Sequence, residues 1–265
     1  MKLLTPATPQ EAQALADALG PRARFIAGGT LLQQAWAEDS RLAPPDISFI
    51  DIQQWPATQR IAIDGQTLRI GAGARLEAVR RDPLVLAHAP LLAEALGQLG
   101  ALGVRRLGTL GGNLGWGMGD AAPVMLALDA EVELADGQRE PMAHTMAHTM
   151  ARPGQTLMVA FHLPLAPQRA MHAVFEKVGY RAAFSPARLR MALRWAEASR
   201  GRTLCRVAVA APDLRVHRLA NVEALVADTG AHVDLHAIRR ACLTTLPAPL
   251  AAMASRLIAG HCGLL

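Results

Sequence analysis

The stretch of sequence that decides the fold runs from Gly100 to Pro123 and reads GALGVRRLGTLGGNLGWGMGDAAP. Its centre, Gly108–Asn113, combines three glycines with the hydroxyl of Thr109 and a side-chain amide. Glycine has no Cβ, so a ligand can approach the main chain closely and backbone N–H groups can point at an anion. The hydroxyl and the amide suit phosphate and sugar oxygens. We therefore expect Gly108–Asn113, here called the second glycine segment, to be a phosphate-binding loop.

A comparable turn lies earlier in the chain, at Ala27–Leu31, here called the first glycine segment. The stretch RARFIA, residues 22–27, is typical of a short buried strand, and LLQQAWAE, residues 31–38, is typical of a helix. A glycine turn before a helix offers an anion site at the positive end of that helix. One such turn is often only a turn, but two in one domain favour a dinucleotide, because two loops can share the charges of a pyrophosphate. Neither segment has the G-x-G-x-x-G pattern or the GK[ST] of a P-loop.

The rest of the sequence predicts two successive domains. At 265 residues and 51% hydrophobic composition, the chain has the size at which cores divide. The elements predicted in the first part are a helix from the capping box Thr8–Glu11 to Leu19, a strand at 47–52, a hairpin of 60–64 and 67–71, helices at 77–81, 90–99 and 124–128, and strands at 131–135, 138–141 and 156–163. Pro164 and Pro167 suit a linker. The elements predicted after it are strands at 173–179, 189–195 and 204–210, a helix at 221–227 and helices through the last thirty residues.

Composition excludes several classes of function. The formal charge is +5, but the arginines are scattered and no basic tract with interleaved aromatics occurs, so we expect no nucleic-acid partner. No stretch of about 18 uninterrupted apolar residues and no apolar leader occur, which predicts a cytoplasmic protein without a membrane-spanning segment. Cys205, Cys242 and Cys262 stand too far apart for a zinc or iron-sulfur site. His144 and His148 would share a helix face but lack a third ligand, so we expect no metal.

Four stretches of the sequence together resemble a known family. They are FIAGGTLL (Phe25–Leu32), LRIGAGARLEAV (Leu68–Val79), RRLGTLGGNLG (Arg105–Gly115) and FEKVGYRAAF (Phe175–Phe184). In this order they resemble the FAD-binding, or medium, subunits of the molybdenum hydroxylase family, which include the flavoprotein subunits of xanthine dehydrogenase, carbon monoxide dehydrogenase and aldehyde oxidoreductase. Four blocks spread over most of the chain make the resemblance specific.

The resemblance implies an α+β fold. Residues 1–165 would form a two-lobed FAD-binding domain of the molybdopterin dehydrogenase type. This type of domain has the vanillyl-alcohol-oxidase-like (PCMH) fold. Within it we expect an N-terminal α/β lobe at about residues 1–56 and a second α+β lobe at about 57–165. A small α+β C-terminal flavoprotein domain would follow at residues 166–265.

The resemblance also implies a set of cofactor-binding residues. They are Ala27, Gly28, Gly29, Thr30 and Leu31 in the first glycine segment, Thr109, Gly111, Gly112 and Asn113 in the second, and Asp120 and Lys177 outside both. The two segments would hold the pyrophosphate of FAD, and Asp120 would bond ribityl or ribose hydroxyls. Lys177 would approach the pyrimidine edge of the flavin, where a cation stabilises the anionic reduced ring. The alternative for Lys177 is a solvated strand lysine.

The function implied by the resemblance is electron transfer within an oxidoreductase heterotrimer. Substrate would be hydroxylated at a molybdopterin centre on a large partner subunit, and electrons would pass through 2Fe–2S clusters on an iron-sulfur subunit to FAD on this chain and then to an external acceptor. The sequence shows no nucleophile or paired-carboxylate signature, so we expect no catalytic residue on this chain. Export of the complex on a partner's signal is compatible with the sequence. Two alternatives stay open, a stand-alone flavin oxidase and an interaction module that has kept the fold and lost FAD.

Overall fold

The computed structural model describes residues 1–32, 46–151, 155–165, 171–181, 186–197, 202–212, 214–227 and 233–264. The chain divides into two units. The first comprises Met1–Ala121 and Asp129–Leu165, and the second comprises Ala122–Leu128 and Ala166–Leu265. Residues 122–128 therefore belong to the second unit although they lie within the sequence of the first.

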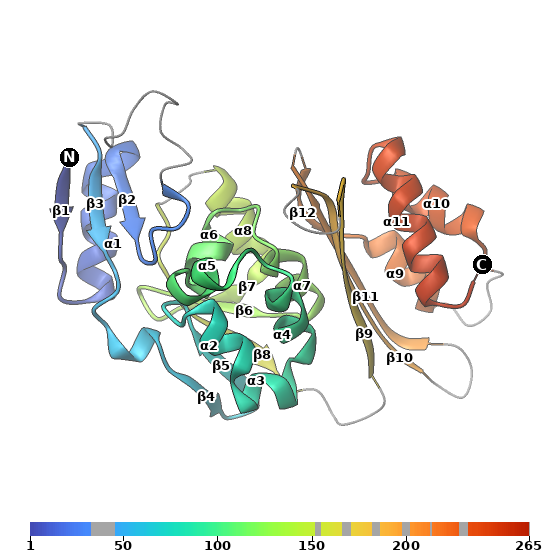
Figure 1. Cartoon of the computed structure of the whole chain (residues 1–265), viewed down its shortest axis with the longest axis horizontal. Coiled ribbons are helices and arrows are strands. Elements are labelled where there is room, and N and C mark those ends of the chain that lie inside the picture. The colour runs from blue at the N-terminus through green and yellow to red at the C-terminus, as the bar shows by residue number, and fades with distance from the viewer. Residues whose placement is uncertain are drawn as a thin grey trace. The chain divides into compact units, whose positions relative to one another are not determined.

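A three-stranded parallel sheet opens the first unit (Figure 1). Its strands are β1 (Lys2–Leu4), β2 (Ala23–Ile26) and β3 (Ser48–Asp51), in the order β1-β3-β2. Parallel strands need a crossover, and helix α1 (Pro9–Leu19) lies in the connection from β1 to β2. The backbone N–H of Ile52 donates to the carbonyl of Ile26 at 3.1 Å. This bond fixes the end of β2, which leads into the first glycine segment, against the end of β3.

The bounds of α1 follow from its end residues, as the sequence predicts. Thr8 is the N-cap residue, and its Oγ1 accepts the backbone N–H of Glu11 at 3.2 Å. Gly20 ends the helix at φ +56°, a left-handed conformation that glycine adopts without steric cost. Ala12 and Ala16 are fully buried and place a flat apolar stripe in the core that includes β2 and β3. The predicted helix and its capping are confirmed.

An antiparallel five-stranded sheet forms the second sheet of the first unit (Figure 1). Its strands are β4 (Ile61–Asp64), β5 (Thr67–Gly71), β6 (Glu131–Leu134), β7 (Arg139–Pro141) and β8 (Met158–Pro164), in the order β4-β5-β8-β6-β7. The helices between β5 and β6 are α2 (Leu76–Arg81), α3 (Pro83–His88), α4 (Pro90–Gly97), α5 (Leu102–Leu107), α6 (Leu110–Gly115) and α7 (Ala121–Ala127), and α8 (Met142–Ala151) lies between β7 and β8. The predicted hairpin of β4 and β5 is confirmed, and the strands predicted at 131–135 and 138–141 also form a hairpin; the two turns contain Gly65 and Gly137 at φ +56° and +84°.

The two faces of this sheet differ in polarity because side chains alternate along each strand. One face carries Ile70, Phe161 and Val132 in register across β5, β8 and β6, and all three are fully buried. Each such burial stabilises the fold by roughly 1.5–3 kcal/mol relative to an exposed side chain.

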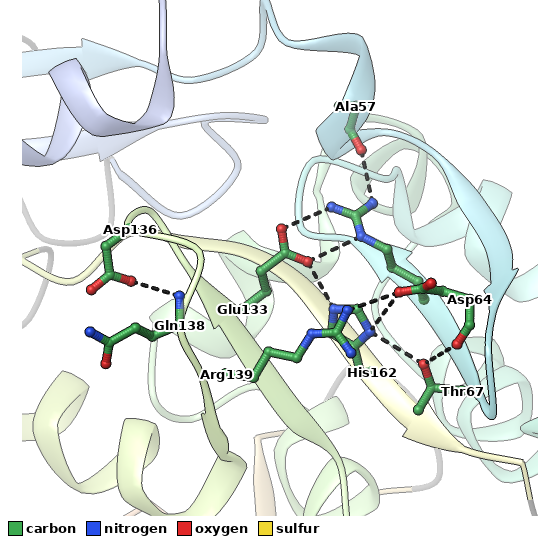
Figure 2. A network of polar contacts seen from close by, with 9 residues as sticks. Ala57, Asp64, Thr67, Glu133, Asp136, Gln138, Arg139 and His162 are labelled. Carbon is green, nitrogen blue, oxygen red and sulfur yellow. Dashed lines mark hydrogen bonds and ion pairs between the residues drawn. The ribbon is translucent and has the colours of Figure 1, made fainter.

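The opposite face carries a network of charged side chains, drawn in Figure 2. His162 on β8 is fully buried, and its Nε2 lies 2.8 Å from Oε2 of Glu133 on β6. Arg69 on β5 donates to the same carboxylate at 3.1 and 3.3 Å. Asp64 and Arg139 form an ion pair at 2.9 Å beside the imidazole ring. Burial by itself would raise the pKa of Glu133, but the bonds from Arg69 and His162 hold that pKa below its ordinary value.

The second unit contains a four-stranded antiparallel sheet with helices on one face (Figure 1). Its strands are β9 (Met171–Gly179), β10 (Ala187–Glu197), β11 (Arg202–Ala211) and β12 (Leu214–Arg218), in the order β12-β11-β10-β9. The helices that follow the sheet in sequence are α9 (Ala220–Ala227), α10 (Leu235–Leu243) and α11 (Ala248–His261), and all but the first residue of α7 also belongs to this unit. Alternate residues of β10 join the helices in one apolar core, whose buried members include Leu189, Met191, Leu193, Trp195, Ile238, Ala254 and Ile258.

The three cysteines lie in this same core as free, buried thiols. Burial raises the pKa of Cys205 to about 12 and that of Cys242 to about 11. Both thiols therefore stay protonated at neutral pH, which makes them poor nucleophiles and poor metal ligands.

The structure corrects the sequence analysis in the glycine-rich stretch. We expect a loop at the second glycine segment from its sequence, whereas most of that segment is the first turn of helix α6. Strand β1, helix α3, helix α5 and strand β12 are further elements that the sequence analysis does not predict. The helix predicted at residues 31–38 falls mainly outside the described residues. Among the described helices, none is long and apolar enough to cross a membrane.

Candidate functional site

The two glycine segments meet in the structure. Gly28 packs closely on Leu107, the residue directly before the second glycine segment. A Cβ at position 28 would overlap the carbonyl oxygen of Leu107. The same Cβ would lie 2.6 Å from the carbonyl carbon of Leu107 and 2.8 Å from Cα of Gly108. Thr30 adds its Oγ1 on the same side, 3.5 Å from where a Cβ of Gly108 would lie. Position 28 therefore accepts only glycine if the two segments are to stay in contact.

The first glycine segment offers backbone donors. Gly29 is exposed and has φ +66°, with open space where a side chain would project. Within the described part of the chain, no hydrogen bond engages the backbone N–H groups of Gly28, Gly29 or Thr30. Successive free N–H groups beside a left-handed residue form a concavity that suits an anion.

The second glycine segment uses its backbone donors within the chain. The N–H groups of Leu110 and Gly111 donate to the carbonyls of Ala74 and Ala72 at 3.0 and 2.8 Å. Thr109 is the N-cap residue of α6, and its Oγ1 accepts the N–H of Gly112 at 3.1 Å. We expect free N–H groups here from the sequence, and the structure corrects this. What the segment offers to a ligand is the hydroxyl hydrogen of Thr109 and the exposed main chain at Gly112.

Gly111 packs closely against the loop after β5. A Cβ at position 111 would lie 2.8 Å from Cβ of Ala72 and 2.9 Å from its carbonyl oxygen. These distances are shorter than side chains tolerate, so any side chain at this position would displace α6 from the loop after β5.

Asn113 and Asp120 lie next to each other at the start of α7. The Oδ1 of Asn113 accepts the backbone N–H of Ala121 at 3.2 Å, and a Cβ on Gly119 would overlap the Asn113 side chain. Asn113 and Asp120 are buried, with 8% and 7% of their surface exposed. The oxygen of Asn113 is thus committed to holding α7, which leaves its amide nitrogen as the group that a ligand could bond.

Lys177 lies in the other unit. It is half-buried on β9, opposite Arg190 on β10. Of the residues that the resemblance implicates, the structure brings together the first glycine segment, the second glycine segment and Asp120, all in the first unit.

Residues 72–75, directly after β5, form part of the site, although the sequence analysis includes them only in a stretch that resembles the family and gives them no role in binding. The carbonyls of Ala72 and Ala74 receive the two α6 bonds described above, and the backbone of Arg75 pairs with Thr109 as an isolated bridge. The signal that could reveal them is the sequence GAGAR after a strand, since small residues permit a close backbone approach.

A charged cluster on Glu77 fixes the approach to the second glycine segment. The carboxylate accepts hydrogen bonds from Arg80 at 2.7 Å, Arg105 at 2.8 Å and Arg81 at 2.6 Å. These bonds hold the pKa of Glu77 well below its ordinary value of 4.5, and the bond from Arg80 has the largest effect. Arg105 lies on α5, which runs directly into Gly108, so the cluster ties the helix before the segment to α2.

Among the described residues, no group of three or more histidine, cysteine or carboxylate side chains is arranged so that it could hold a metal ion. The two histidines of the AHTMAHTM repeat lie on α8, and the side chain of His148 lies outside the described residues.

Comparison with protein families gives one matching family model. It is described as the FAD binding domain in molybdopterin dehydrogenase, and it matches residues 1–166. The matched range contains both glycine segments and Asp120, and it ends before Lys177.

Similar curated proteins are subunits of dehydrogenases. The nicotinate dehydrogenase FAD-subunit of Eubacterium barkeri is 35% identical over 112 residues, which cover 42% of this chain and 37% of that protein. The putative xanthine dehydrogenase FAD-binding subunit of Escherichia coli K12 is 29% identical over 177 residues, or 61% and 58% of the two chains. The carbon monoxide dehydrogenase medium chain of Hydrogenophaga pseudoflava is 37% identical over 107 residues, or 40% and 36%. The alignments thus span between 36% and 58% of these relatives.

Solved structures share the fold over nearly the whole chain. Carbon monoxide dehydrogenase from Hydrogenophaga pseudoflava, in a form that lacks the Mo-pyranopterin moiety, superposes with a TM-score of 0.82 and 24% identity, covering 97% of this chain and 94% of that chain. Quinoline 2-oxidoreductase from Pseudomonas putida 86 superposes with a TM-score of 0.78 and 21% identity, covering 100% and 95%. These likenesses establish the α+β fold that the sequence analysis expects.

Proposed function

We propose, given that this chain belongs to the family of FAD binding domains in molybdopterin dehydrogenases, that it is the FAD-carrying electron-transfer subunit of a molybdenum hydroxylase. In this role it receives electrons from the iron-sulfur clusters of one partner subunit and passes them to an external acceptor. Substrate hydroxylation takes place at a molybdopterin centre on a second, larger partner. The similarity to the nicotinate dehydrogenase FAD-subunit and to the carbon monoxide dehydrogenase medium chain supports this assignment.

The observation that carries the proposal is the packing of Gly28 against Leu107. It brings a segment with free backbone donors next to a second segment with a buried threonine hydroxyl and an exposed glycine. A diphosphate needs several donors from more than one direction and close approach to the main chain. The residues present therefore fit the pyrophosphate of FAD.

Each residue has a stated part in this proposal. The N–H groups of Gly28, Gly29 and Thr30 donate to phosphate oxygens, and Thr109 adds its hydroxyl. Asp120, beside Asn113 at the start of α7, accepts hydrogen bonds from sugar hydroxyls. Bound FAD supplies the redox chemistry of the chain. Lys177, on β9, would supply a positive charge that favours the anionic reduced flavin.

This role requires no nucleophile and no general acid or base from the chain. Its residues bind and orient the cofactor, which is the usual contribution of a protein to flavin chemistry.

The experiment that tests the proposal is an absorption spectrum of the purified chain, followed by chromatography of the flavin released on heating. We expect the bands of oxidised flavin and a released compound that co-elutes with FAD. A colourless chain that stays colourless after incubation with FAD would contradict the proposal and support an interaction module without cofactor. Oxidation of a substrate by the chain without partners would instead support a stand-alone flavin oxidase.

A second measurement tests the electron-transfer part. Co-expression with the iron-sulfur and molybdopterin subunits should give a complex in which substrate bleaches the flavin bands. The same substrate should leave the flavin of the isolated chain oxidised. Bleaching of the isolated chain, or a complex whose flavin never bleaches, would argue against transfer from a partner subunit.

A further inference from the structure

The side chain of Arg75 bonds to two segments that lie far apart in the sequence. Arg75 is half-buried and is the N-cap residue of α2. Its Nη1 donates to the backbone carbonyl of Leu107, and its Nη2 donates to Oε1 of Gln53 at 3.0 Å. The guanidinium therefore joins the chain after β3 to the residue before the second glycine segment.

The Leu107 carbonyl is the same group against which Gly28 packs. Gly28 contacts this carbonyl without bonding it, whereas Arg75 holds it with a charge-assisted hydrogen bond, which is stronger than a neutral one. The main chain continues the attachment, because the N–H of Leu76 donates to the carbonyl of Gly108 at 3.0 Å. Arg75 and the start of α2 therefore determine where the Leu107–Gly108 peptide lies.

Gln53 is itself anchored to the first sheet. Its backbone N–H donates to Oδ1 of Asp51 at 3.0 Å, and its carbonyl accepts Nε2 of Gln59 at 2.9 Å. Asp51 is the last residue of β3, which pairs with β2, and β2 leads into the first glycine segment. Arg75 thus connects to the first glycine segment through β3 and β2, and to the second through Leu107.

From this geometry we propose that Arg75 is a positioning residue that fixes the spacing of the two glycine segments and so sets the affinity of the chain for FAD. The inference rests on the proposed function, because the spacing matters only when a diphosphate bridges the segments. Arginine suits the position because its planar group presents several donors at fixed angles, whereas a lysine ammonium is a single flexible charge. Lysine cannot hold Leu107 and Gln53 together in the same geometry.

The test is a titration of FAD into the whole, flavin-free chain. Binding is monitored by the quenching of flavin fluorescence. The variants are Arg75→Lys, Arg75→Met and Gln53→Leu. The matched control is Arg60→Met, since the exposed Arg60 side chain makes no bond within the described ranges. Displacement of FAD by ADP reports the diphosphate interaction without the flavin ring, and the thermal midpoint of the ligand-free chain reports the fold.

We expect both Arg75 variants to weaken FAD and ADP binding by the same factor, about tenfold or more, as for the loss of a charge-assisted hydrogen bond. Gln53→Leu should give a smaller loss in the same direction, and Arg60→Met should stay within about twofold. Gln53→Leu also keeps the proposal testable if an Arg75 variant does not fold.

Three outcomes would overturn the inference. Wild-type affinity in both Arg75 variants would show that the spacing does not depend on this side chain. Wild-type affinity in Arg75→Lys together with weak binding in Arg75→Met would show that only the charge matters. A lowered thermal midpoint with unchanged affinities for FAD and ADP would show that Arg75 stabilises the fold alone. If the wild-type chain binds no FAD, the proposed function itself is wrong, and this inference falls with it.

Discussion

His162 and Glu133 lie on the neighbouring strands β8 and β6, with Nε2 and Oε2 2.8 Å apart and the imidazole fully shielded from solvent. The Glu133 carboxylate also receives two hydrogen bonds from Arg69, so one acidic group satisfies polar groups on both β5 and β8 (Figure 2). Buried polar groups are costly when they lose a partner, and this network is therefore a sensitive point of the first unit.

Replacing Arg69 with methionine should destabilise the chain. The change removes both arginine bonds from Glu133, a largely buried carboxylate, and we expect the free energy of unfolding at pH 7 to fall by about 1–3 kcal/mol. The measurement is urea denaturation. The control is Arg139→Met, whose ion pair with Asp64 is about half exposed and should contribute about 0–1 kcal/mol. An equal loss of unfolding free energy in the two variants would contradict the prediction that the bonds to Glu133 stabilise the fold more than the ion pair of Asp64 does.

Replacing Gly28 with alanine should weaken FAD binding without unfolding the chain. The added Cβ would overlap the Leu107 carbonyl, so the two glycine segments must move apart. Overpacking of this kind costs about 1–3 kcal/mol, which corresponds to a loss of about 5- to 150-fold in affinity. Fluorescence titration with FAD measures it. Gly29→Ala is the comparison, because open space surrounds position 29 and only its φ of +66° opposes a side chain. A larger loss in Gly29→Ala than in Gly28→Ala would argue against the contact between the segments.

Replacing Glu77 with glutamine should lower the thermal midpoint at neutral pH, because it removes the acceptor charge shared by three arginines. The folded pKa of Glu77 lies below the unfolded one, so its stabilisation is present above the unfolded pKa and is lost as the pH falls through the folded value. The gap between wild type and variant should therefore shrink once the pH falls below about 4.3. Scans of thermal midpoint against pH check this, with the exposed Glu94→Gln as control. A gap independent of pH would contradict the electrostatic explanation.

The cysteine thiols should resist labelling until the chain unfolds. With a pKa raised to about 12, roughly one Cys205 thiol in ten thousand is ionised at pH 8, and only the thiolate reacts. We expect a thiol-specific disulfide reagent to label all three cysteines in urea and none within minutes in the folded state. Because the folded pKa is raised, the associated stability is present below the unfolded value and is lost as the pH rises toward the folded one. Rapid labelling of Cys205 or Cys242 in the folded chain would disprove this burial.

Local signals in the sequence predict much of the fold. The Thr8 cap and Gly20 define α1, and the turns at Gly65 and Gly137 define two hairpins, because a single residue's conformational preference decides each of these features. Strands β9, β10 and β11 of the second unit follow from their apolar residues, and the burial of Leu189, Met191 and Leu193 on β10 reflects this pattern.

The short helices of the glycine-rich stretch cannot be predicted in the same way. Gly111 and Gly112 lower helix propensity by about 1 kcal/mol each, so α6 is unfavourable on local grounds. The structure forms it because Thr109 caps it and because Gly111 fits against Ala72, a contact between residues distant in sequence. Tertiary packing here overrides propensity.

The candidate site can be predicted only in part, because contacts between residues distant in sequence also determine its geometry. The two glycine segments can be recognised as sequence motifs, but the residues that hold them in position cannot. Nothing local marks Gln53 or Arg75 as partners, since their bond joins residues 22 positions apart. The commitment of the Asn113 oxygen to Ala121 likewise appears only in three dimensions.

The membership of Ala122–Leu128 in the second unit has a consequence for how this protein can be divided. The second unit is discontinuous in sequence, so no single cut separates the chain into two complete folding units. A fragment ending at Leu165 would carry Val124, Met125 and Leu126, which are at most 4% exposed in the whole chain, without the other hundred residues of their unit. During synthesis, this helix also emerges well before the rest of its unit. A fragment cut at Leu165 should therefore not refold to the structure that this segment has in the whole chain.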